Sequence, residues 1–191
     1  QQSIDAARTA TNISPQNHLN WQNLASIYRS LIGFGQNAEE FAIRTSQQAI
    51  ILNPKNPLGY ISLGGIYYQL QQWDNAQNQF QIAISLKPDF ANSYYNLGHA
   101  LEQKGELQNA LIQYETVKRL VVNDKKSLDQ ITSEITALED KITTSQTTQS
   151  TSNATVSDNK ALNVDTSPAQ LPTRTPQVKI PAPDVATQSA R

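Results

Sequence analysis

The sequence has no cysteine and no methionine among its 191 residues. The absence of cysteine excludes disulfide bonds and thiolate metal sites. A formal net charge of -1 gives no electrostatic reason to expect nucleic acid as a partner. No apolar run approaches the roughly 18 residues of a membrane span, so we expect no direct membrane insertion by this chain.

Residues suited to catalysis are also scarce. The two histidines, His18 and His99, have no second histidine or carboxylate at metal-ligand spacing. No nucleophile-elbow, phosphate-loop or zinc-protease motif occurs. The sequence therefore predicts a protein that is not an enzyme and that has no metal site and no cofactor.

An internal repeat dominates what is present. The segment 57–88 recurs 34 residues later, and the matched positions are Tyr60, Leu63, Gly64, Tyr67, Ala76, Phe80 and Ala83, which become Tyr94, Leu97, Gly98, Leu101, Ala110, Tyr114 and Val117. A period of this length indicates stacked supersecondary units, each too small to bury its own apolar face. The spacing resembles that of the tetratricopeptide repeat, a helix-turn-helix unit. This resemblance implies an all-α solenoid.

The repeat register divides the chain. Five segments follow from it: a second helix of a truncated repeat (1–14), three repeats (18–56, 57–90 and 91–123) and a C-terminal capping helix (124–143). The first repeat is about five residues longer than the others. We place the extra residues in a Gly-Phe-Gly loop between a helix to about residue 32 and a helix from about residue 37, because glycine disfavours helix. The truncated start suggests a piece of a longer protein.

The segment 124–143 continues the register, with Leu128, Ile131 and Ile135 at core positions. We expect its outward face to carry Glu134 among other charges. A short coiled coil is the alternative for this helix. From residue 144 to residue 191 the chain is rich in Ser, Thr and Pro with few apolar residues, which predicts a disordered tail.

Several packing contacts follow from the register. Gly64 and Gly98 are expected where the two helices of a hairpin approach most closely, opposite Ala76 and Ala110. Three leucines 34 residues apart, expected to face the next repeat, are Leu52, Leu86 and Leu120. Phe34, in the glycine-flanked loop, is expected to fold back onto a neighbour, with exposed docking as the alternative.

In tetratricopeptide arrays the first helices line a concave groove that receives a peptide. By this resemblance the groove residues of our chain are Gln22, Asn23, Ser26, Arg29, Ile61, Ser62, Tyr68, Asn92, Tyr95, Asn96, His99 and Glu102. Amides and tyrosines suit a peptide backbone because they donate, accept and stack. The alternative is a solvated polar face without a ligand. Arrays that clamp chaperone C-termini use lysine and arginine at inner positions where this chain has Gln22, Ser26, Ser62, Asn92 and Asn96, which argues against such a clamp.

The amino-acid sequence of the first repeat, from Asn20 to Asn56, resembles the repeat region of bacterial membrane proteins that are similar to O-antigen ligases and polymerases. The resemblance spans roughly residues 1–185 and implies the soluble part of a membrane-anchored bacterial protein; a cytoplasmic scaffold is the alternative.

Three hypotheses for the function follow from the sequence. The first is a protein-interaction scaffold with a protein or peptide partner, the second is a non-catalytic accessory region of a polysaccharide ligase, and the third is weak self-association through the C-terminal helix.

Overall fold

The computed structural model describes residues 2–35 and 37–154, with side chains described as far as residue 147. These residues form eight α-helices and no strand. The helices are α1 (Gln2–Ile13), α2 (His18–Ser30), α3 (Ala38–Leu52), α4 (Pro57–Gln69), α5 (Trp73–Leu86), α6 (Ala91–Gln103), α7 (Leu107–Leu120) and α8 (Lys125–Ala154). The chain is therefore all-α, as the repeat predicts.

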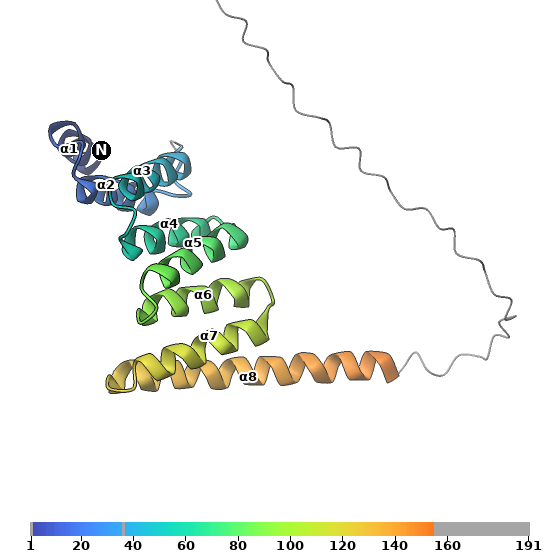
Figure 1. Ribbon diagram of the computed structural model, residues 1–191. Helices are drawn as coiled ribbons and strands as arrows, with labels where there is room; N and C mark the ends of the chain where they lie inside the picture. The colour runs from blue at the N-terminus through green and yellow to red at the C-terminus, as the bar shows by residue number, and fades with distance from the viewer. Residues whose placement is uncertain (1, 36, 155–191) are drawn as a thin grey trace, which may run out of the picture.

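The helices stack in chain order as antiparallel hairpins, α2 with α3, α4 with α5 and α6 with α7 (Figure 1). Local sequence signals set their ends. Asn17 and Asn56 accept backbone hydrogen bonds at the starts of α2 and α4 through their side-chain oxygens. Pro54 and Pro88 follow α3 and α5, where a missing N–H group does little harm. The first two hairpins thus begin after an asparagine cap and end before a proline.

The first helices of the hairpins form one row of the stack, and the second helices form another. The first helices α2, α4 and α6 approach one another, whereas among the described helices the second helices α3, α5 and α7 do not. A stack whose members approach on one side only must curve toward that side. The row of first helices is therefore the inner row of the solenoid.

The lengthened first repeat carries its extra residues between α2 and α3. Gly33 and Gly35 have φ angles of 89° and 90°, a left-handed conformation that favours glycine. Phe34 between them is 82% exposed. The expectation that this ring folds back was therefore wrong, because the two left-handed glycines turn the chain away from both helices.

Two glycines allow the closest contacts within hairpins. A Cβ atom at Gly64 would lie 2.5 Å from the ring of Phe80, and one at Gly98 would overlap the ring of Tyr114. The sequence located these contacts correctly but assigned the wrong partners. Aromatic rings, and not the buried alanines Ala76 and Ala110, fill the space that the missing side chains leave.

Three leucines near the ends of the second helices were expected to face the next repeat. Leu86 and Leu120 are instead each 38% exposed, and Leu52 is half-buried. Each is the last residue of its helix. Those expectations were wrong for Leu86 and Leu120.

Helix α8 closes the stack. Asp124 accepts hydrogen bonds from the N–H groups of Lys126 and Ser127 at its start. Ile131, Ile135 and Leu138 are buried in the C-terminal core. None of the large apolar side chains described in α8 is exposed, so the helix presents no apolar stripe to a second copy.

Residues 144–154 continue α8, so the expectation of disorder was wrong for this part of the tail. No glycine or proline occurs from residue 125 to residue 154, and a helix already nucleated elongates at little cost. The hydroxyl groups of Thr143 and Ser145 donate to backbone carbonyls four residues earlier. Residues 155–191, the remainder of the predicted tail, lie outside the described part of the chain. Within that part, no helix is both long and apolar enough to cross a membrane.

Candidate functional site

Two hollows open on the inner row of helices. The central hollow is lined by Arg29 of α2, Gly65 and Tyr68 of α4, and Asn96 and His99 of α6. The end hollow lies between α6, α7 and α8, and its lining includes Asn92, Tyr95, Val117, Gln130 and Ile131. The central hollow is the one to which three successive repeats contribute.

A recurring contact joins neighbouring repeats beside the central hollow. The Nε atom of Arg29 lies 3.3 Å from the side-chain oxygen of Gln69 and donates to it. One repeat later, Tyr68 hydrogen-bonds Gln103. Arg29 and Tyr68 are equivalent in the register, as are Gln69 and Gln103. The same two repeat positions therefore join successive first helices in both places.

Gly65 shapes the floor of the central hollow. Its equivalent in the next repeat is His99, which carries a full side chain. A Cβ atom at Gly65 would lie 2.9 Å from Nη1 and 3.0 Å from Nη2 of Arg29. The guanidinium group therefore rests directly on the backbone of α4, in space that a larger residue would fill.

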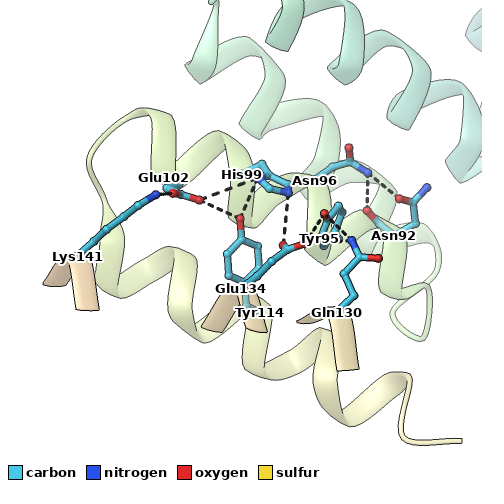
Figure 2. Close-up of polar contacts among 9 residues, drawn as sticks. All are labelled: Asn92, Tyr95, Asn96, His99, Glu102, Tyr114, Gln130, Glu134 and Lys141. Carbon is cyan, nitrogen blue, oxygen red and sulfur yellow. Dashed lines mark hydrogen bonds and ion pairs between the residues drawn. The ribbon is translucent and has the colours of Figure 1, made fainter. Parts of the chain in front are cut away.

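A polar network joins α6, α7 and α8 next to the hollows (Figure 2). The hydroxyl of Tyr95 donates to Oε1 of Glu134 at 2.9 Å. The hydroxyl of Tyr114 donates to Oε2 of Glu102 at 3.2 Å and lies 3.0 Å from Nδ1 of His99. The first contact binds α8 to the inner row and the contacts of Tyr114 bind α7 to it, in each case through α6 side chains that sequence reasoning assigned to the groove.

Lys141 of α8 completes the network by donating to Oε1 of Glu102. Burial raises the pKa of Glu102, but the hydrogen bond and charge of Lys141 outweigh it and hold the pKa below its usual value. Burial and the Glu102 carboxylate raise the pKa of Tyr114, and burial together with Glu134 raises the pKa of Tyr95. Both tyrosines therefore remain neutral hydrogen-bond donors.

The predicted groove residues divide into four groups. Arg29, Tyr68, Asn96 and His99 come together in the central hollow, while Asn92 and Tyr95 line the end hollow and Glu102 pairs with α8. The remaining predicted residues line neither hollow and are Gln22, Asn23, Ser26, Ile61 and Ser62.

Sequence reasoning missed the α8 residues of the network, Gln130, Glu134 and Lys141. Glu134 was expected on the outward face, but 27% of its side chain is exposed and it contacts Tyr95. The register contained the correct signal, since Glu134 lies 34 residues after Ala100, which is fully buried. The prediction followed the pattern of charges on the helix and not the repeat position of Glu134.

The hollows are lined by hydrogen-bonding groups. In the part of the chain that the structure describes, no group of three or more histidine or acidic residues could hold a metal ion. The central hollow offers a guanidinium group, a phenol, an amide and an imidazole, all of which donate or accept hydrogen bonds. Such a lining suits a peptide.

Comparison with known proteins finds matches in the repeat region of the chain. A family model described as TPR repeat matches residues 64–105, and one described as tetratricopeptide repeat matches residues 91–120. The chain is 34% identical over 74 residues to small glutamine-rich tetratricopeptide repeat-containing protein 2 of Mycosarcoma maydis. It is 32% identical over 73 residues to a probable UDP-N-acetylglucosamine–peptide N-acetylglucosaminyltransferase of Arabidopsis thaliana. These matches cover 39% and 38% of our chain but only 21% and 8% of the relatives.

Solved structures show the same fold. A thermophilic TPR protein of Thermus thermophilus superposes with a TM-score of 0.61 at 20% identity, over 68% of our chain and 70% of that chain. MamA superposes with a TM-score of 0.55 at 20% identity, over 84% and 87%. The first TPR of RPAP3, bound to an HSP90 peptide, gives 0.51 at 22% identity, over 63% and 97%. These likenesses establish the solenoid fold.

Proposed function

We propose that this chain, an α-solenoid of tetratricopeptide repeats, is an interaction scaffold that binds an extended peptide segment along its inner row of helices. Tetratricopeptide proteins generally mediate protein–protein interactions and are typically non-catalytic. The observation that carries the proposal is the central hollow, to which α2, α4 and α6 all contribute side chains. A ligand spanning several repeats needs such a shared surface.

The lining supports a peptide as the ligand. Asn96 and His99 supply hydrogen-bond donors and acceptors, and Tyr68 supplies a ring with a hydroxyl group. Leu19 and Leu58, at the starts of α2 and α4, are 58% and 51% exposed. They add apolar surface for alternate side chains of an extended segment.

Peptide selection tests the proposal. Short random peptides displayed on phage are selected on the chain, and the affinities of the enriched sequences are measured. Asn96→Tyr fills the central hollow with a neutral ring and is expected to weaken binding at least about tenfold. Gln81→Tyr places the same ring on the exposed surface of α5 and should leave binding unchanged. Selected peptides that bind Asn96→Tyr with undiminished affinity would refute recognition in the hollow.

A second proposal concerns the parent protein. The loop that lengthens the first repeat and contains Phe34 is the feature on which the resemblance to O-antigen ligase-like proteins is most specific. In this proposal the solenoid is a non-catalytic accessory region of such a protein. Reading the coding DNA upstream of Gln1 tests it, because spans of about 20 apolar residues are expected there.

A further inference from the structure

Arg29 differs from the other charged side chains that line or border the hollows. Glu102, its equivalent two repeats later, pairs with Lys141. Arg29 forms no ion pair with any carboxylate among the described residues, and the hydrogen bond from its side chain to Gln69 uses Nε alone. The four N–H bonds of Nη1 and Nη2 are therefore left for another acceptor.

The position of Arg29 makes this arrangement unfavourable without a ligand. The guanidinium group is half-buried against Gly65 at the edge of the central hollow. Burial lowers the pKa of Arg29, which shows that part of its hydration is lost without a compensating negative charge. A partly desolvated and unpaired cation gains more from an anion than a fully hydrated one does.

We infer that the central hollow receives the carboxylate of an aspartate or glutamate side chain of the bound peptide, held by the Nη atoms of Arg29 over Gly65. The inference rests on the proposed function and adds the chemistry of one ligand residue. A carboxylate matches the planar fork of a guanidinium group with two parallel hydrogen bonds. Asn96 and His99 flank the same hollow and are placed to contact the peptide beside that residue.

The acidic side chains of this chain that lie nearby do not pair with Arg29. Glu102 is held by Lys141 and Tyr114, and Glu134 accepts hydrogen bonds from Tyr95 and Gln130. Both belong to the network that binds α8. Arg29 therefore remains the cation that faces the hollow without a carboxylate partner among the described residues, since its side chain donates only to the amide oxygen of Gln69.

A double-mutant cycle tests the inference. Peptides selected on the wild-type chain are synthesised with each Asp or Glu changed in turn to Asn or Gln. One such change is expected to weaken binding to the wild-type chain by about tenfold or more, the usual effect of losing a charge-assisted hydrogen bond. On Arg29→Met the same change should make no further difference, whereas on Arg44→Met it should retain its full effect. Arg44 is a matched control because it is an exposed arginine paired with Glu40.

Arg29→Lys keeps the charge but removes the fork, and its affinity is expected to lie between those of the wild type and Arg29→Met. Circular dichroism shows whether each variant is folded. If Arg29→Met does not fold, Arg29→Lys replaces it in the double-mutant cycle. Peptides without an essential acidic residue, or an acidic residue that matters equally on Arg29→Met, would overturn the inference. If such peptides still bind Asn96→Tyr more weakly than the wild type, peptide binding in the hollow is supported and only the recognition of a carboxylate is refuted. If they bind Asn96→Tyr with unchanged affinity, both the proposed function and the inference are refuted.

Discussion

At the scale of single residues, Glu134 is the least satisfied group in the network. When the Tyr114 hydroxyl donates to Glu102, the matching tautomer of His99 carries its proton on Nδ1 and donates it to the Tyr114 oxygen. Nε2 of His99 is then an acceptor, and it lies 3.8 Å from Oε2 of Glu134. Oε2 is buried without a hydrogen-bond partner. Two acceptors face each other, and one hydrogen-bond donor is missing between them.

Glu134→Gln should supply that donor. The new amide keeps the oxygen that accepts from Tyr95 and turns an N–H group toward His99, so we expect the free energy of unfolding to rise by about 1 kcal/mol. Urea unfolding at neutral pH measures it. Asp129→Asn removes an exposed charge from the same helix and should change stability by less than about 0.5 kcal/mol. A lower stability for Glu134→Gln would mean that Nε2 of His99 carries a proton and already donates it to Glu134.

At the scale of elements, α8 has two halves with different surroundings. The first half buries Ile131, Ile135 and Leu138 against the stack. The second half projects beyond the N-terminal start of α7 (Figure 1). Its helical state follows from elongation and from the absence of glycine and proline, and tertiary packing supports it less.

Proline substitutions should separate the two halves. Thr136→Pro removes a backbone hydrogen bond within the packed half and is expected to lower global stability by about 3 kcal/mol or more. Gln149→Pro does the same in the projecting half, where only the helix end should fray and global stability should change by less than about 0.5 kcal/mol. Urea unfolding followed by circular dichroism checks both. Equal losses would show that residues 144–154 are part of the cooperative fold.

At the scale of the whole molecule, the sequence predicts the helices well because a 34-residue period carries its own redundancy. The tyrosines, leucines and glycines of one copy confirm those of the next, and proline marks the helix ends. The same logic fails where the repeat ends. Glu134 has a buried equivalent in Ala100, but the charge pattern of the helix was given more weight, and the polar composition of residues 144–154 misled the prediction of disorder. The central hollow was only partly predictable, since it depends on which side chains of different repeats meet.

The buried residues form two clusters. One spans α5 to α8 and includes Phe80, Leu97 and Tyr114; the other includes Ala7, Leu24 and Ile66 and is smaller. Each helix packs mainly on its neighbours in the chain. In a solenoid of this kind, stability is close to a sum of local terms and need not be uniform along the chain.

Leu24 and Leu97 test this division because they occupy the same repeat position, are 4% and 5% exposed, and belong to different clusters. Changing either to alanine is expected to cost about 2–5 kcal/mol locally. Hydrogen exchange measured by mass spectrometry should show that Leu24→Ala accelerates exchange in α1 to α3 and spares α6 to α8. Leu97→Ala should do the reverse. Because coupling passes only through neighbouring helices, the effect should decline across α4 and α5. A uniform loss of protection along the chain in both variants would show instead that the solenoid unfolds as one unit.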